Sequence, residues 1–253
     1  MTEKFLCAQI SDMHIRAGDD GAALRQLRRA LSQARDYRVD AILLTGDLAN
    51  DERADEYALL ADALVDPPAP TFLLPGNHDD RELIRRTFAS RHPYLPRSGP
   101  LSFVLDQFAL RIVMVDQTAP GETHGVLTEA QAAWLDAELA AAPARPTLIA
   151  MHHPPFPTYD VLFDTIGLRD RDLFASVIAR HPQVLRIVCG HHHRVVFGQV
   201  AHAPVVAAPS TSWTYGLALH DGQKIAPKTN DQPGWMLHAW SQGLGLASHF
   251  MGI

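Results

Sequence analysis

This chain has little cysteine, no long hydrophobic run and no recognisable export signal. Its 253 residues include two cysteines, Cys7 and Cys189, and both lie in apolar stretches typical of buried strands, so a disulfide framework is not expected. No apolar stretch reaches the length of about 18 residues that indicates a membrane-spanning helix, and the N-terminus lacks the pattern of a signal peptide. These absences predict a cytoplasmic protein without a membrane segment.

The charge balance indicates which partners to expect, and the lack of a linker indicates the number of domains. The formal net charge is −6 with the 14 histidines counted as neutral, so the chain lacks the basic surface of proteins that bind long nucleic acids. No nucleic-acid polymer is therefore expected as a partner, whereas small phosphorylated substrates suit this composition. No stretch rich in proline, glycine or serine divides the chain, and 47% of the residues are apolar, which favours a single domain over residues 1–253.

Short apolar runs alternate with stretches of helical periodicity, and this alternation predicts a layered α/β fold. The expected strands in the first part of the chain are residues 5–10, 41–45, 71–74, 101–105, 110–115, 147–151 and 185–189. The expected helices are residues 22–34, 53–65, 81–89, 128–141 and 171–180. The pair 101–105 and 110–115 is expected to form a hairpin.

The C-terminal part reads as antiparallel strands and one irregular connection. Four strand candidates are expected to close a second sheet, and they are residues 195–200, 205–208, 234–240 and 244–250. The connection from Pro209 to Pro233 has the length and composition of a lid or binding loop. An alternative is a solvated loop with Trp213 packed on the core.

Five short motifs stand at the ends of successive expected strands. In chain order they are Asp12-Met13-His14, Gly46-Asp47, Gly76-Asn77-His78-Asp79, His152-His153-Pro154 and Gly190-His191-His192-His193. Each motif alone is weak, but open α/β sheets bind ligands outside the carboxyl ends of their strands, where all five are expected to meet. They supply enough carboxylate, amide and imidazole groups for two metal ions, and this mixture suits Mn, Fe, Co or Zn.

The ordered set resembles the calcineurin-like metallophosphoesterase family, and the match runs from Asp12 to His193. The resemblance implies a four-layer α/β/β/α sandwich with two divalent metal ions. It implies that the first metal is held by Asp12, His14, His193 and a shared oxygen of Asp47, and the second by Asp47, Asn77, His152 and His191. A shared carboxylate is physically sensible, because an anionic bridge offsets the repulsion of two close cations.

The resemblance also implies roles for residues beside the ligands. His78 is expected to lie by the metals, where it stabilises the transition state or protonates the leaving oxygen, with Asp79 orienting it. The alternative for His78 is a structural histidine that donates to a backbone carbonyl. Asn77, His78 and His124 are the candidates for contact with the substrate, and His124 would have to reach the site from its loop.

Two histidines that adjoin ligands are expected to point away from the metals. Successive side chains of an extended segment face opposite sides, so His192 should point away if His191 and His193 face the metals. His152 is preferred over His153 because it fills the first place of the H-x-P motif.

The residues in and around the motifs resemble those of one bacterial branch of the family, the class III cyclic-nucleotide phosphodiesterases and glycerophosphodiesterases. The segments Gln9 to His14 and Pro75 to Asp80 carry this likeness. It implies hydrolysis of small phosphodiesters, such as 3',5'-cyclic nucleotides or glycerophosphodiesters, by attack of metal-bound hydroxide. Relatives of this kind often form dimers, which implies a homodimer.

Two alternatives to a phosphodiesterase stay open. A phosphomonoesterase or nucleotide pyrophosphatase would use the same metals. A non-catalytic interaction module of the same fold is expected to have lost ligands, whereas every ligand position is filled in this chain. The part after Gly190 to His193 is shorter than in the larger glycerophosphodiesterases, so the substrate is not fixed by the resemblance.

Overall fold

A computed structural model describes residues 4–223, 228–229 and 231–253 and arranges them as two mixed sheets flanked by helices. The first sheet has the order β13 (Gly245–Gly252), β12 (Gly234–Ser241), β1 (Phe5–Ile10), β2 (Ala41–Thr45) and β3 (Thr71–Leu74). The second sheet has the order β4 (Phe103–Leu105), β5 (Arg111–Met114), β6 (Thr147–Ala150), β7 (Val184–Cys189), β9 (Ala203–Ala207) and β8 (Val196–Val200). A small third sheet pairs β10 (Thr214–Tyr215) with β11 (Lys228–Thr229).

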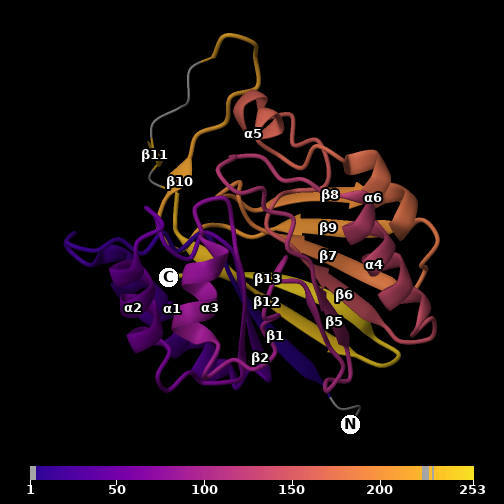
Figure 1. The fold of residues 1–253 in the computed structure, drawn as a ribbon, viewed down its shortest axis with the longest axis horizontal. Helices are drawn as coiled ribbons and strands as arrows, with labels where there is room; N and C mark the ends of the chain where they lie inside the picture. Colours follow the sequence, from indigo (N-terminus) through magenta and orange to yellow (C-terminus); the bar gives the residue numbers. More distant parts are fainter. Residues whose placement is uncertain (1–3, 224–227, 230) are drawn as a thin grey trace.

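The helices form the two outer layers (Figure 1). On one side lie α1 (Ala22–Tyr37), α2 (Ala54–Ala63) and α3 (Arg81–Phe88), and on the other lie α4 (Glu129–Ala140) and α6 (Arg171–Ile178). The short α5 (Val161–Thr165) lies apart from both groups, near the end of the molecule that carries β10. This arrangement confirms the predicted α/β/β/α sandwich.

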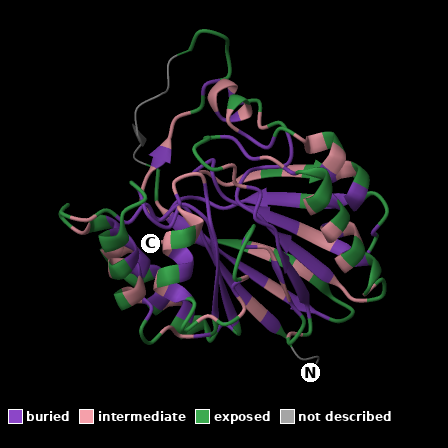
Figure 2. Cartoon of the chain, viewed as in Figure 1, coloured by how far each residue is buried: buried purple, intermediate pink, exposed green. Residues whose placement is uncertain are grey.

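Local sequence explains where the helices begin and how they face the sheets. At the start of α4, the Thr128 hydroxyl accepts from the backbone N–H of Gln131, and the Gln131 side chain accepts from the Thr128 N–H, which is a capping box. Helix α1 buries residues at helical spacing, among them Leu27, Ala30 and Ala34. Figure 2 shows the same division across the molecule, with buried residues along the strands and exposed residues on the outer faces of the helices.

Two apolar cores lie between the layers, and one strand can contribute to both. This is possible because successive side chains of a strand point to opposite faces. On β5, Ile112 and Met114 belong to the larger core, which includes residues of both sheets and of α1 to α3. Val113 lies between them in the chain and belongs to the second core, which includes Leu135 of α4 and Phe174 of α6. Strands buried on both faces are expected for parallel strands covered by helices.

The predicted elements are confirmed to within three residues at each end, and so is the antiparallel hairpin β4–β5. The four C-terminal strands form two antiparallel pairs, as expected, but the expectation that all four close a second sheet is wrong. Strands β8 and β9 join the second sheet, with β9 parallel to β7, whereas β12 pairs antiparallel with β1 in the first sheet and carries β13 at its edge. The apolar pattern of a buried strand shows its burial but not its neighbour, so it could not decide between the sheets.

The connection from Pro209 to Pro233 contributes β10 and β11, and its residues 224–227 and 230 lie outside the described part. The pattern did not predict α5, which follows the H-x-P motif. None of the helices in the described residues is long and apolar enough to cross a membrane.

Candidate metal centre

The ligand motifs follow neighbouring strands that end at the same edge of the sandwich. Asp12 follows β1, Asp47 follows β2 and Asn77 follows β3, while His152 follows β6 and His191 follows β7. Strands β1, β2 and β3 are parallel, and so are β6 and β7, so that each sheet brings its motifs together.

The backbone turns sharply at most of these residues. Nine residues other than glycine have a positive φ in the described part of the chain, and five of them are predicted ligands. Their φ angles are 53° at Asp12, 46° at His14, 51° at Asp47, 69° at His191 and 58° at His193. This conformation is uncommon for residues with a side chain, and its concentration at one place is typical of functional sites.

These turns are held by hydrogen bonds between the loops after β1 and β2. The backbone N–H of Asp12 donates to the carbonyl of Gly46 at 3.0 Å, and that of His14 donates to the carbonyl of Asp47 at 2.9 Å. Gly46 has a φ of 94°, and a Cβ there would collide with the ring of His152. The G-D motif therefore needs its glycine for the close approach of the two sheets.

The first group of side chains consists of Asp12, His14, Asp47 and His193, all of them buried. The Nε2 atoms of His14 and His193 are 3.0 Å apart. His14 Nε2 lies 3.4 Å from Oδ2 of Asp47, and His193 Nε2 lies 3.5 Å from Oδ1 of Asp12. Two imidazoles and two carboxylates thus point at one small volume.

The second group is built around the other oxygen of Asp47. Nε2 of His152 lies 3.3 Å from Oδ1 of Asp47 and 3.2 Å from Oδ1 of Asn77. The same Asn77 oxygen lies 2.9 Å from Nδ1 of His191. Asp47 therefore presents one carboxylate oxygen to each group, and all seven predicted ligands are brought together.

These buried ionisable side chains would be costly in a protein interior without a partner, and divalent cations would provide one. Burial and the nearby charge of Asp47 raise the pKa of Asp12 to about 7, although His152 opposes the shift. Burial alone would lower the pKa of His152, and the Asp47 carboxylate more than offsets it and raises that pKa to about 9. Two buried carboxylates with four converging imidazoles match the oxygen and nitrogen donors of a dinuclear metal site.

Hydrogen bonds at Nδ1 fix the orientation of two of the predicted ligands. His152 donates from Nδ1 to the carbonyl of Thr45 at 2.8 Å, and His193 donates from Nδ1 to the carbonyl of Trp213 at 3.0 Å. In both rings Nε2 is then left for a metal, which is the usual arrangement for histidine ligands. The sequence pattern did not identify these carbonyls, because any residue can supply one.

His78 is held differently from what the motif suggested. Its Nδ1 donates to the carbonyl of Asn50 at 2.9 Å, its ring contacts that of His14 at 4.8 Å between centroids, and its backbone N–H donates to Oδ1 of Asp47 at 3.0 Å. The expectation that Asp79 orients His78 is not met, since Asn50 does so. The alternative hypothesis for His78 expected a hydrogen bond to a backbone carbonyl, and such a bond is present at Nδ1.

Asp79 instead fixes the loops that carry two ligands. Its carboxylate accepts from the backbone N–H groups of Leu48, Ala49 and Gly76 at 2.8–3.1 Å and from the hydroxyl of Tyr57 at 3.0 Å. Burial, together with the charge of Asp47, raises its pKa to about 6. Asp79 thus joins the turn after β2 to the turn after β3, and Tyr57 was not predicted to take part.

His153 lies nearer to the ligands than expected. It forms a group with His152 and His191 that is compatible with a metal ion, and its ring centroid is 4.5 Å from that of His191. Both of its ring nitrogens have other partners, however. Nδ1 lies 3.2 Å from the side-chain amide of Gln117, and Nε2 donates to the carbonyl of Thr123 at 3.2 Å.

His192 packs against Phe163 with 4.5 Å between ring centroids, outside both groups of ligands. The reason given for its orientation was wrong, since the segment is not extended. His191 and His193 reach the site through left-handed turns. His124 is buried beside Glu122 at 3.4 Å and does not occur among the described residues that line the cleft at the site.

A cleft of about 370 Å³ opens over the ligands. Phe163, Trp213 and Tyr215 form an aromatic wall, and Arg16 and His78 also line the cleft. The Trp213 ring lies 4.5 Å from that of His14, and Tyr215 lies 5.0 Å from His193, so the wall adjoins the first group of ligands. Phe163 comes from the unpredicted α5, and the irregular composition around Trp213 was the only sequence signal for this wall.

Comparisons with known proteins agree with this geometry. A family model described as calcineurin-like phosphoesterase matches residues 6–195. The chain is 32% identical over 218 residues to a glycerophosphodiester phosphodiesterase of Enterobacter lignolyticus, covering 81% of this chain and 77% of that protein. It is 30% identical over 247 residues to a 3',5'-cyclic adenosine monophosphate phosphodiesterase of Vibrio vulnificus, covering 91% and 85%.

The fold has a similar counterpart among solved structures. A dimetal phosphatase from Danio rerio superposes with a TM-score of 0.77 over 98% of this chain and 96% of that one, at 16% sequence identity. At this identity the likeness supports the fold alone. The family model and the two curated relatives, each covering most of the chain, show that the protein belongs to the calcineurin-like phosphoesterase family.

Proposed function

We propose that this protein hydrolyses small phosphodiesters with the help of two divalent metal ions, of the Mn, Fe, Co or Zn type. The observation that carries the proposal is the position of Asp47, whose two oxygens face two separate groups of nitrogen and oxygen donors. Bound there, two such ions would neutralise the phosphoryl oxygens and make an effective nucleophile available at neutral pH.

We assign the seven ligands to the two metals as the geometry groups them. Asp12, His14 and His193 would hold the first ion and Asn77, His152 and His191 the second, with Asp47 shared. His153 and His192 would bind neither, since His153 has Gln117 and Thr123 as partners and His192 packs on Phe163.

His78 is the residue best placed to act on the leaving group. Because its Nδ1–H is used by the Asn50 carbonyl, Nε2 is the nitrogen left to face the cleft. In the doubly protonated ring, the proton on Nε2 can pass to an alkoxide oxygen as it leaves phosphorus, and Nδ1 keeps its own proton. Asp79 supports this position indirectly, by fixing the loop on which His78 stands.

The charge of the cleft favours a diester over a monoester. Arg16 is the one lysine or arginine among the described residues that line it, and its side chain is about half exposed and 3.5 Å from Asp51. A monoester dianion carries more negative charge than a diester and gains more from a basic cluster. The aromatic wall adds a surface on which a nucleobase can stack, so 3',5'-cyclic nucleotides are candidate substrates beside glycerophosphodiesters.

The proposal is tested by comparing substrates at one metal loading. We expect a higher kcat/KM for bis(p-nitrophenyl) phosphate than for p-nitrophenyl phosphate, and turnover of a cyclic nucleotide or a glycerophosphodiester in a panel of small esters. A higher kcat/KM for the monoester would favour a phosphomonoesterase, and preference for a dinucleotide pyrophosphate would favour a pyrophosphatase. A homodimer is a further proposal, which sedimentation of the purified protein tests.

A further inference from the structure

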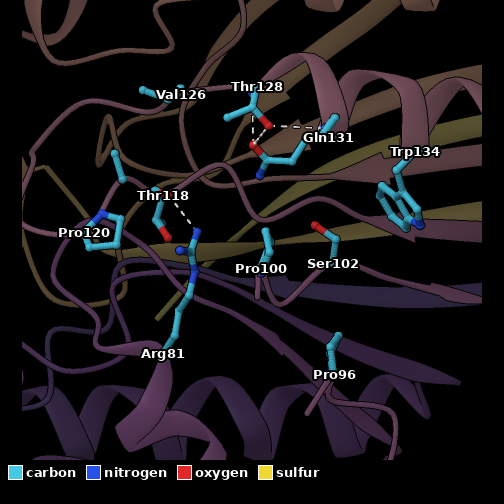
Figure 3. A pocket seen from close by; sticks show the side chains of 12 residues that line it. Arg81, Pro96, Pro100, Ser102, Thr118, Pro120, Val126, Thr128, Gln131 and Trp134 are labelled. Atoms are coloured by element: carbon cyan, nitrogen blue, oxygen red, sulfur yellow. Dashed lines mark hydrogen bonds between the residues drawn. The ribbon is translucent and has the colours of Figure 1, made fainter. Parts of the chain in front are cut away.

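A second hollow, larger than the metal cleft, lies beside helix α4 and has no role in the proposed chemistry (Figure 3). We call it the α4 pocket; its volume is about 580 Å³, and it is lined mainly by Pro96, Pro100, Pro120, Val126 and Trp134. Figure 3 shows Trp134 at one end and Arg81 toward the other. Pockets of this size with a mostly apolar lining are typical sites for small organic groups.

The polar groups at the edge of the α4 pocket are already paired. Arg81 donates from Nε and from Nη2 to the two oxygens of the buried Asp116 at 2.6 and 2.8 Å, and from Nη2 to the carbonyl of Thr118 at 2.7 Å. Thr128 and Gln131 bond to each other in the capping box. The Arg81 charge is thus largely neutralised, so the pocket favours an uncharged apolar group over an anion.

A third hollow of about 370 Å³, the intermediate hollow, shares lining residues with both the α4 pocket and the metal cleft. The intermediate hollow shares Asn77 with the metal cleft, and it shares Arg81, Pro100 and Thr118 with the α4 pocket. Asn77 and Arg81 are thus the residues past which a molecule anchored at the metal centre would extend toward Trp134.

The charges along this path exclude a second phosphate. Four carboxylates line the intermediate hollow, namely Glu52, Asp79, Asp80 and Glu82. Its two arginines are both paired, Arg81 with Asp116 and Arg85 with Glu82. A second anionic group would meet this excess of carboxylates, whereas a neutral chain would pass it.

We propose that the α4 pocket binds the uncharged apolar arm of a phosphodiester whose phosphate lies at the metal centre. This proposal rests on the proposed function, and it deepens it by naming the class of ester: one arm is an extended alkyl or aryl group.

The test uses p-nitrophenyl esters with methyl, butyl and octyl phosphate arms. Burial of each further methylene should raise kcat/KM about two- to fourfold over the lengths that reach the pocket. Ala130→Trp places a large side chain at the pocket wall and should abolish most of this gain, so that the octyl-to-methyl ratio falls toward one. Ala137→Trp is the matched control, because Ala137 is exposed on the same helix and does not line the pocket.

A second measurement needs neither metal nor turnover. Octyl methyl phosphate should shift the fluorescence of the metal-free protein, and Trp134→Phe should remove that shift. Dimethyl phosphate, which has no long arm, should leave the fluorescence as it is.

The outcomes separate this inference from the proposed function. Turnover of the methyl ester with no gain from longer arms and no fluorescence shift would overturn the pocket assignment alone. A fluorescence shift without turnover of any diester would support the pocket and overturn the phosphodiesterase proposal. A gain in kcat/KM with arm length that persists in Ala130→Trp would place the arm elsewhere. A change in oligomeric mass confined to Ala130→Trp would assign the pocket to a second copy of the chain. Either result overturns the inference.

Discussion

Gln9 on β1 donates from Nε2 to the backbone carbonyl of Cys189 on β7 at 2.8 Å, and this hydrogen bond joins the two sheets directly beneath the ligands. The same Nε2 donates to the hydroxyl of Thr45 on β2 at 3.0 Å, and Oε1 lies 3.1 Å from Nε2 of His238 on β12. One buried side chain thus contacts three strands besides its own. Each of β1, β2 and β7 leads straight into a ligand motif, so Gln9 sets the spacing of the two halves of the site.

We expect Gln9→Met to lower both the stability and the metal affinity of the protein. Methionine has a similar volume, but it leaves the buried His238 Nε2 without its partner, at about 1–3 kcal/mol for an unsatisfied group. It also removes one of the two donors to the carbonyl of Cys189, which keeps only the backbone N–H of Ala208. Weaker support of the ligands should also raise the metal Kd about 10–100-fold. Urea unfolding and metal titration measure the two effects.

Gln199→Met is the control for this change, since Gln199 is exposed on β8 and donates to the carbonyl of Ala201. Its unfolding free energy should stay within about 0.5 kcal/mol of the parent. Equal losses in the two variants would show that Gln9 does not join the sheets.

His238 should make the metal-free fold sensitive to acid. Burial, with the positive charge of Arg186 nearby, lowers its pKa from 6.5 to about 3 in the folded protein. Between these values the unfolded chain binds a proton that the folded protein does not. The contribution of neutral His238 to stability is therefore complete above about pH 6.5 and is lost as the pH falls toward 3, at about 1.4 kcal/mol per pH unit.

Replacing His238 by glutamine removes this titration while keeping a polar side chain beside Gln9. Between pH 6 and pH 4 the unfolding free energy of His238→Gln should therefore fall less steeply than that of the parent. Urea unfolding at several pH values measures both slopes. If the two slopes coincide, His238 is not buried in its neutral form.

The sequence predicted the side chains that meet at the candidate metal centre better than it predicted the groups that support them, and the reason is chemical. The predicted aspartate and histidine ligands would bind through their side chains, so their residue types are visible in a motif such as Gly190 to His193. The carbonyls of Thr45, Asn50 and Trp213 act through the backbone, where residue type leaves no trace. Left-handed turns at His191 and His193 were hidden for a similar reason, because φ is set by the surrounding loops as well as by residue type.

The sheet to which β12 belongs was not predicted, for a different reason. Its alternating pattern is erased by burial on both faces, and its partner β1 lies at the opposite end of the chain. Pairing at such sequence separation is decided by the packing of the whole sandwich rather than by local residues. The order of the first strands was predictable, since each is followed by a helix that returns the chain in parallel.

His152→Ala should lose the second metal and most activity, whereas His153→Ala should retain the metal and lose at most about 10–100-fold in activity. The reason is that His152 points Nε2 at Asp47 and Asn77, while the two ring nitrogens of His153 have partners outside the ligand set. The proximity of His153 to His191 makes this a demanding comparison. Loss of the second metal in His153→Ala, with His152→Ala unaffected, would reverse the assignment.

Asp47→Ala should bind fewer metal ions than the parent, because it removes a donor from both groups at once. Elemental analysis of the reconstituted parent should approach two equivalents per chain, and that of the variant should reach one or fewer. Asp62→Ala is the control, as Asp62 is exposed on α2 and should leave two equivalents bound. A parent that never exceeds one equivalent at saturating Mn or Co would contradict the dinuclear assignment.

His78→Ala should slow substrates with an alkoxide leaving group more than substrates with a nitrophenolate leaving group. The Asn50 carbonyl holds Nδ1 of His78, so Nε2 is the atom available to protonate an oxygen leaving phosphorus. A ribose or glycerol oxygen leaves poorly without a proton, and general acid catalysis is worth about 10²–10⁴-fold, whereas a nitrophenolate needs little help. Comparing kcat for a cyclic nucleotide and for bis(p-nitrophenyl) phosphate measures the difference. Equal losses on both substrates would instead show that His78 stabilises charge or positions the ester, because neither role depends on the basicity of the leaving group.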